Sequence, residues 1–302
     1  MAELLYAHLA AFFYSEVWAV QLPKLEAMRA ALEFLRTGNR YSAEEVASIM
    51  AARPAQAQPL PSVAVLPLYG VISHRANLVN GASGGTSVQQ FTKVFRQAAA
   101  DPSIGAIVLD VDSPGGSVSG VPELAAEIRA ARAQKPILAV ANSLAASAAY
   151  WLGAQASESY VIPSGEVGSI GVYAMHQDES GFYDKAGVKT TLVSAGKYKT
   201  ENSPFSPLSE DGRDYLQGRV DDYYSMFVRD VAEGRGVEAD LVRSGWGEGR
   251  VLGAQQAKAE GMVDDIATLD EVIQRAGRLV RDNARLKGEL ELRQYQAKRF
   301  GS

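Results

Sequence analysis

From residue 63 onward, short apolar runs alternate with segments of helical pattern, and this alternation limits the fold more than any other feature. The runs VAVLPLYGVI, GAIVLDVDS and KPILAVAN begin at residues 63, 105 and 135. Between the last two, VPELAAEIRAARAQ has helical spacing. Near-continuous apolar strands separated by helices are typical of a sheet that is covered on both faces. The sequence therefore predicts an α/β core.

The same pattern continues towards residue 196. We expect a helix in LAASAAYWLGAQA and another in DESGFYDKAG. We expect strands in SYVIP, in GSIGVYAM and in KTTLVSAG. These three segments are expected to extend the α/β core beyond the strands that precede residue 143.

The residues on either side of this core follow other patterns. Helical spacing of apolar residues predicts a helix over 17–36, and Ser42 with Glu45 predicts a short capped helix over 42–50. AARPAQAQPLPS reads as a linker. Long helices are predicted over 209–234, capped by Ser209, and from residue 268. We divide the chain into a helical extension with linker, a core domain and a terminal amphipathic helix: 1–62, 63–267 and 268–302.

Composition excludes several classes of function. A net charge of −5 gives no reason to expect nucleic-acid binding. The absence of cysteine excludes disulfides, thiolate zinc sites and a cysteine nucleophile, and it fits a reducing compartment. The sequence contains no cluster of metal-ligating or cofactor-binding residues, so we expect no metal and no other cofactor. The apolar N-terminus lacks a basic region and is interrupted by Glu3 and Glu16, so we expect neither a signal peptide nor a membrane span.

Two motifs place reactive groups after strands. DVDSPGGSVSG (110–120) ends a strand in adjacent glycines, which can expose a peptide N–H to an oxyanion or simply form a tight turn. In SLAASAAYWLG (143–153), Ser147 falls where a helix should begin, and its small neighbours leave room for a substrate carbonyl. A closely packed helix with an incidental serine is the alternative.

A serine nucleophile needs a base. SAGKYKTENSPF offers Lys197 and Lys199 after an expected strand. A lysine can serve if burial lowers its pKa from about 10.4 towards 7–8. A lysine in such a loop is otherwise a solvated surface charge.

In the order DSPGGS, SLAASAAYW, GSIGV and SAGKYKTENSPF, the chain resembles the signal peptide peptidase A family of serine peptidases. The likeness covers about 63–267, including GRVLGAQQAKAEGMVDDI. The N-terminal EVWAVQLPKLEAMRAALEFLRTG resembles the phage branch, whose members mature the prohead by cutting scaffold protein. The resemblance implies a Clp-protease-like (crotonase-like) α/β fold, here with a helical N-terminal extension and a C-terminal helix.

The resemblance also implies a Ser-Lys dyad. The nucleophile would be Ser147, the base Lys199, and the residue that holds the lysine amine Ser169. The oxyanion would be held by the N–H groups of Gly116 and Ala148. Many members have ASGGY where this chain has ASAAY, so Ala148 and Ala149 replace glycines.

Other readings stay open. His176 follows Ser147 by 29 positions, so a Ser-His-Asp triad with Asp178 or Asp112 would resemble that of the Clp protease subunit. An acyl-CoA enzyme of crotonase type would share the fold without needing the dyad. A shell protein without activity is a third reading, against which the intact Ser147 and Lys199 argue.

Several expectations concern partners. A peptide or protein substrate, such as a phage scaffold protein, should add as a strand along the glycine-rich edge, with small residues near the cut. This substrate-binding edge comprises Gly115, Gly116, Ser117 and Val118. We expect a homo-oligomeric ring, because the resemblance implies shared sites and both long helices carry apolar residues that could serve contacts between subunits. The expected location is cytoplasmic: the host cytoplasm, or the prohead interior if a phage encodes the chain.

Overall fold

The computed structural model describes residues 13–14, 16–37, 42, 44, 59–60, 62–75 and 85–300. Its centre is an eight-stranded sheet in the order β11-β10-β8-β6-β3-β2, with β9 and β12 branching from β8. The ladders β3–β6, β6–β8, β8–β10, β8–β9 and β9–β12 are parallel, whereas β2–β3 and β10–β11 are antiparallel. The strands are β2 (Pro59–Leu60), β3 (Val63–Tyr69), β6 (Ala106–Ser113), β8 (Ile137–Ala146), β9 (Glu158–Val161), β10 (Glu166–Gly168), β11 (Val251–Gly253) and β12 (Asp265–Ile266).

A second sheet of four short strands lies where β6 ends. Its order is β1-β7-β4-β5. The strands are β1 (Trp18–Val20), β4 (Ile72–Ser73), β5 (Thr86–Ser87) and β7 (Gly115–Ser117). Only Pro114 separates β7 from β6, so the glycine-rich turn of the sequence leads directly from the central sheet into this small sheet.

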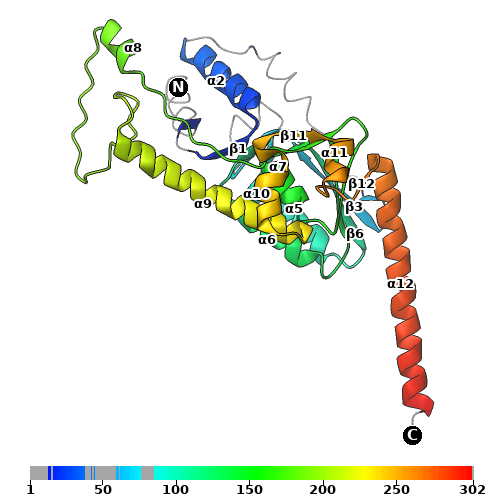
Figure 1. Ribbon diagram of the computed structural model, residues 1–302. Coiled ribbons are helices and arrows are strands. Elements are labelled where there is room, and N and C mark those ends of the chain that lie inside the picture. Colours follow the sequence, from blue (N-terminus) through cyan, green and yellow to red (C-terminus); the bar gives the residue numbers. More distant parts are fainter. Residues whose placement is uncertain are drawn as a thin grey trace.

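Helices cover both faces of the central sheet, as Figure 1 shows. One face packs against α5 (Val88–Ala100), α6 (Val121–Ala131), α7 (Ala148–Gly153) and the C-terminal part of α9 (Glu210–Arg235). The other face packs against the first turns of α12 (Leu269–Phe300), through Val272 and Ala276. The remaining helices are α2 (Leu22–Arg36), α8 (Ser180–Lys185), α10 (Ala239–Gly245), the 3₁₀ turn η1 (Gly247–Gly249) and α11 (Ala254–Ala259). Among the helices described, none has the length and hydropathy that crossing a membrane requires.

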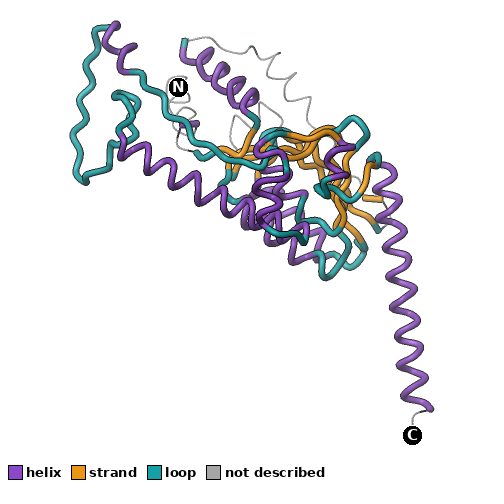
Figure 2. The backbone as a smooth tube through the Cα atoms, in the orientation of Figure 1, coloured by secondary structure: helices purple, strands orange, loops and turns teal. Residues whose placement is uncertain are grey.

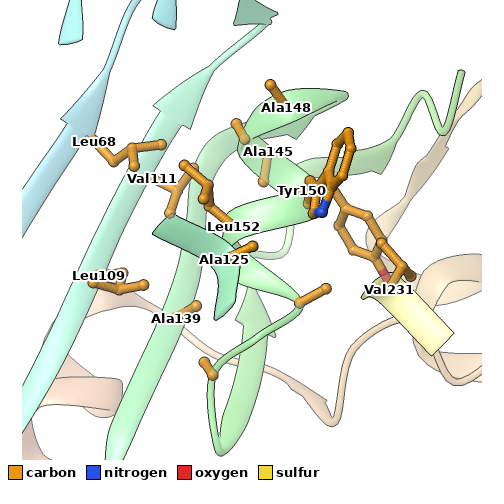
Figure 3. Packing of buried hydrophobic residues seen from close by; sticks show 14 of the residues in the cluster. Leu68, Leu109, Val111, Ala125, Ala139, Ala145, Ala148, Tyr150, Leu152 and Val231 are labelled. Carbon is orange, nitrogen blue, oxygen red and sulfur yellow. The ribbon is translucent and has the colours of Figure 1, made fainter. Parts of the chain in front are cut away.

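The alternation of side chains along each strand explains these two covered faces. In β6, Ile107, Leu109 and Val111 join the larger core, whereas Ala106 and Val108 join the core under α12. Figure 3 shows part of the larger core around α7, with Val111 of β6 beside Leu152 and Leu109 further along the same strand. The α/β prediction is confirmed.

Residues 174–208, which we call the arm, leave the body between Tyr173 and α9. Figure 2 shows the arm as long loops interrupted by the short helix α8, at the end of α9 that is remote from the central sheet. Every residue from 184 to 199 is exposed, and Val193 is 95% exposed. The arm therefore lacks a core of its own.

The structure confirms most predicted elements and corrects four. Helices α6, α8, α9 with its Ser209 cap, and α12 lie where they were expected. The helix predicted over 17–36 is wrong at its start, because residues 18–20 form β1 and Pro23 can sit only in the first turn of α2. The helix predicted in LAASAAYWLGAQA is also wrong at its start, because residues 144–146 still belong to β8 and α7 begins at Ala148.

The strand predicted in GSIGVYAM is wrong, because β10 ends at Gly168 and residues 169–175 form no strand. The strand predicted in 189–196 is also wrong, since these exposed residues pair with no sheet. Most of the predicted helix 42–50 and linker 51–62 lies outside the described residues.

Candidate active site

Ser147 occupies a sharp turn between β8 and α7. Its backbone has φ 57° and ψ −122°, a sparsely populated conformation that costs on the order of 1–3 kcal/mol. Two backbone hydrogen bonds hold the turn: the Ser147 N–H donates to the Gly168 carbonyl at 2.7 Å, and the Ser147 carbonyl accepts from Trp151 at 2.9 Å. A serine on a strained strand-to-helix turn has the local geometry of a nucleophile elbow.

The helix after Ser147 is anchored deep in the core. Trp151 stacks on Phe227 of α9 with ring centroids 4.4 Å apart, and its indole N–H donates to Asp230 at 3.0 Å. Ala148 and Ala149 are fully buried within α7 and keep φ negative, so the positive φ of this turn falls on the serine instead. The alanines that replace the family's glycines are therefore accommodated without backbone strain.

The glycine-rich turn lies against Ser147. A methyl group on Gly115, whose φ is +97°, would lie 2.9 Å from Cβ of Ser147. One on Gly116 would lie 1.8 Å from the Ile72 carbonyl oxygen, so only glycine allows β4 and β7 to approach this closely. Ser113 fixes the turn, because its hydroxyl donates to the Gly70 carbonyl at 2.6 Å and accepts from the Gly115 N–H at 3.2 Å.

Ser169 lies beside the same turn. It directly follows Gly168, the backbone partner of Ser147, and it too has a positive φ, 55°. Its N–H donates to the Arg250 carbonyl at 2.7 Å. The Ser147 hydroxyl points to this side, where it makes a long hydrogen bond of 3.4 Å to the Gly171 carbonyl. The structure thus brings together Ser147, Ala148, Ser169 and the turn that contains Gly116.

Lys199 is the predicted site residue that this chain does not bring to Ser147. It lies on the exposed arm, and its backbone N–H donates to the Gly196 carbonyl at 3.2 Å. Its neighbour Lys197 contacts the Tyr198 hydroxyl at 2.6 Å. The amine of Lys199 has no interaction with Ser147 or Ser169 among those found in the described residues.

His176 does not form a triad with Ser147 either. Its Nε2 lies 3.1 Å from the Ser203 carbonyl oxygen, within the arm. With Asp178 and Arg213, His176 lines a cavity of about 520 Å³ between the start of the arm and α9. The Ser180 hydroxyl and N–H keep the pKa of Asp178 low, and Asp112 is exposed at the end of β6. The arrangement gives no support to the Ser-His-Asp reading.

A buried polar cluster lies in the sheet before the glycine-rich turn. Asp110 accepts hydrogen bonds from the Tyr69 hydroxyl and, at 3.0 Å, from the Asn142 amide. Burial raises the pKa of Asp110, although both hydrogen bonds oppose the shift. Burial and the neighbouring Asp110 raise the pKa of Tyr69. The cluster ties together β3, β6 and β8, the three strands that lead to the site.

Two site features escaped the sequence reasoning. Ser113 could have been found, because a hydroxyl before Pro-Gly-Gly is well placed to bond the turn that follows. Strand β1 could not, because its three residues merge into the helical spacing of α2. Its Ala19 carbonyl oxygen nonetheless lies 2.2 Å from where a methyl group on Gly115 would be.

Comparisons with known proteins identify the family to which the chain belongs. The model of peptidase family S49 matches residues 129–282. The capsid assembly protease C of Escherichia phage lambda is 32% identical over 245 residues, covering 78% of this chain and 55% of that protein. The head-tail preconnector protein GP5 of Enterobacteria phage P21 is 32% identical, covering 77% of this chain and 46% of that protein. The chain thus spans about half the length of these curated relatives.

More distant similarities extend to a cellular relative and to solved structures. A putative signal peptide peptidase SppA of Enterococcus faecium is 28% identical, covering 61% of this chain and 54% of that protein. A solved structure of the 1510-N membrane-bound stomatin-specific protease is 15% identical, with a TM-score of 0.45 and coverage of 71% of this chain and 79% of that one. Since the family model spans half of the chain, and relatives with protease names match most of it, the chain belongs to peptidase family S49.

Proposed function

We propose that this protein is a serine endopeptidase in which Ser147 is the nucleophile. The strained turn that holds Ser147 against the glycine-rich turn is the observation that carries the proposal. Such a conformation persists only where the surrounding structure enforces it, and here β8, β10 and α7 do so. An acyl-CoA enzyme would have no need of a serine in that position.

In the proposed mechanism, Ser147 Oγ attacks the carbonyl carbon of the scissile peptide while its proton passes to the amine of Lys199. The N–H groups of Gly116 and Ala148 stabilise the resulting oxyanion. The protonated amine then gives its proton to the leaving nitrogen, and water hydrolyses the acyl-enzyme. Ser169 holds the lysine amine in position.

The base must be placed against this site by assembly. Lys199 lies on an arm that makes few contacts with its own core, and an exposed ammonium is fully solvated. A ring would let the arm of one subunit dock beside the Ser147 turn of another and dehydrate Lys199 there. This supports the homo-oligomeric ring expected from the resemblance.

The substrate is a protein segment that binds in extended form, and a phage scaffold protein is the candidate. The relatives named as a capsid assembly protease and as a head-tail preconnector protein come from phages. Small side chains should flank the cut, because Ser147 lies in closely packed surroundings, where Ala145, Ala148 and Ala149 are all buried. The working location would be the host cytoplasm or the prohead interior.

A fluorophosphonate probe tests the proposal, because it reacts only with an activated serine. After exhaustive incubation, mass spectrometry of tryptic peptides should find the label on Ser147, and on no serine when Ser147→Ala is used. Lys199→Ala and Lys199→Arg should both stay unlabelled, since neither can accept the proton. Labelling of Lys199→Ala at the wild-type rate would rule out Lys199 as the base.

A further inference from the structure

Strand β1 lies in the place that an added substrate strand would take. It pairs antiparallel with β7, with Trp18 opposite Ser117, Ala19 opposite Gly116 and Val20 opposite Gly115. On its other side, Trp18 exchanges two backbone hydrogen bonds with Tyr173, of 2.9 and 3.0 Å. Residues 17–20 are therefore held in extended form between the glycine-rich edge and the start of the arm.

The register puts one carbonyl of β1 at the site. The Val118 N–H donates to Val17 at 3.1 Å, and the Gln21 N–H donates to Pro114 at 3.0 Å. Hydrogen-bonded pairs alternate along an antiparallel ladder, so Ala19 and Gly116, midway between these pairs, face each other through their backbone groups. The Ala19 carbonyl thereby meets the edge that would hold an oxyanion.

The same carbonyl lies close to the nucleophile. A methyl group on Gly115 would lie 2.2 Å from the Ala19 oxygen and 2.9 Å from Ser147 Cβ, so both groups border one methyl-sized space.

The side chains of β1 alternate as those of a bound peptide would. Val17 and Ala19 face the larger core, which includes Ala145 and Ala148 beside Ser147. Trp18 faces away into a small cluster with α2, and its indole N–H donates to the Phe13 carbonyl at 3.0 Å. The β1 residue that pairs with Gly116 is thus an alanine, a side chain small enough for the closely packed surroundings of Ser147.

We propose that residues 17–20 are the protein's own first substrate and that Ser147 cleaves the bond between Ala19 and Val20. This inference rests on the proposed peptidase function. Until the cut is made, β1 also inhibits the enzyme, because β7 has β1 on one edge and β4 on the other. An external peptide can add to β7 only after β1 has left.

The reaction balances with water as its only co-reactant. Ser147 Oγ bonds to the Ala19 carbonyl carbon, and its proton moves to the Lys199 amine. The bond from that carbon to the Val20 nitrogen then breaks, and the nitrogen takes the proton to become a new amino terminus. Water hydrolyses the ester, which frees the carboxylate of Ala19 and restores the serine.

Intact-mass spectrometry and N-terminal sequencing of the full chain test the proposal, with hydrolysis of an alanine-rich peptide measured in the same sample. We expect the mass to fall by residues 1–19, a new terminus at Val20, and a lag in peptide hydrolysis that ends as the cut proceeds. Ser147→Ala should keep its full mass. A chain that hydrolyses the peptide from the start and keeps residues 1–19 overturns this inference but leaves the peptidase function standing. A chain that hydrolyses nothing and takes no label at Ser147 overturns both.

Two pairs of variants separate occupancy of the site from general loss of structure. Ala19→Arg should leave the chain uncut at residue 19 and abolish the lag, because arginine does not fit beside Ser147. Leu22→Arg, at a position 57% exposed, should be cut like wild type. Cleavage of Ala19→Arg at the same bond contradicts the assignment of Ala19.

The second pair uses two tryptophans that are fully buried and donate to a backbone carbonyl, Trp18 and Trp246. Trp18→Ala should label with fluorophosphonate at least about tenfold faster than wild type that still carries residues 1–19, because losing this anchor favours departure of β1 by more than that factor. Trp246→Ala should show no such increase. Equal labelling rates for Trp18→Ala and wild type would show that β1 does not block the site.

Discussion

The turn that holds Ser147 and the arm that carries Lys199 differ in burial, packing and support. Ser147 is 1% exposed, and the helix after it is anchored by a stacked tryptophan and a buried carboxylate. No residue of the arm is buried, and its helix α8 is six residues long. Ser147 is thus fixed by the fold of its own chain, whereas Lys199 lies on a segment that packs on no core. If the arm packs on a neighbouring subunit, activity should increase on assembly.

The largest effects should come from removing either partner. Ser147→Ala and Lys199→Ala should each lower kcat/KM by several orders of magnitude, since members of one catalytic unit fail together. His176→Ala, which changes only a contact within the arm, should stay within a few-fold of wild type. Measurement on one peptide substrate, with every variant produced as a chain that begins at Val20 and so needs no self-cleavage, decides the matter. The reverse pattern, with Lys199→Ala active and His176→Ala inactive, would restore the triad.

Mixing the two inactive variants tests whether the arm acts on a neighbour. If Lys199 serves the Ser147 of the next subunit, an equimolar mixture of Ser147→Ala and Lys199→Ala should recover about a quarter of the wild-type activity, because that is the fraction of directional contacts that join two intact partners. The subunits must be allowed to exchange, and light scattering should show the same assembly as for wild type. A mixture without activity would place both residues of each site in one chain.

These contrasts also explain what the sequence could and could not predict. Apolar periodicity located β3, β6 and β8 because burial on both faces leaves a continuous signal. SPGGS and ASAAY marked the site because a close approach of backbones demands small residues at given positions. In the arm, KTTLVSAG was wrongly predicted to be a strand, because its residues have high β propensity but no partner strand lies beside them. Strand β1 was missed because its partner residues in β7 lie 95 to 99 positions further along the chain, and such a distant pairing leaves no local pattern.

The stability of the two regions should differ as their packing does. Trp151→Ala should lower the free energy of unfolding by about 3–5 kcal/mol, because it removes a buried ring that stacks on Phe227. Phe182→Ala, in α8 at 52% exposure, should change it by no more than about 0.5 kcal/mol. Urea unfolding of both variants in the Ser147→Ala background avoids self-cleavage. A large loss for Phe182→Ala at concentrations where the protein assembles would instead show that the arm packs on a neighbour.

The smallest effect concerns the end of α9 that is fixed to the core. Arg235 donates two hydrogen bonds of 2.9 Å to Asp264, which also accepts from the Ser159 N–H at 2.6 Å. Burial opposes ionisation of Asp264, but these donors outweigh it and hold its pKa below the ordinary value. Because the lowered pKa belongs to the folded state, its stabilisation is complete above about pH 4, the ordinary aspartate pKa, and is lost as pH falls through the lowered value.

Asp264→Asn should therefore cost about 1–2 kcal/mol at pH 7 and progressively less below pH 4, because the wild-type stabilisation is lost as pH falls through the lowered pKa of Asp264. Asp240→Asn breaks an exposed ion pair with Arg243 on the neighbouring α10 and should cost less than about 0.5 kcal/mol at either pH. Urea unfolding at pH 7 and at pH 3 gives both differences. A cost for Asp264→Asn that stayed constant between these pH values would mean that the hydrogen bonds at the base of α9 do not depend on the charge of Asp264.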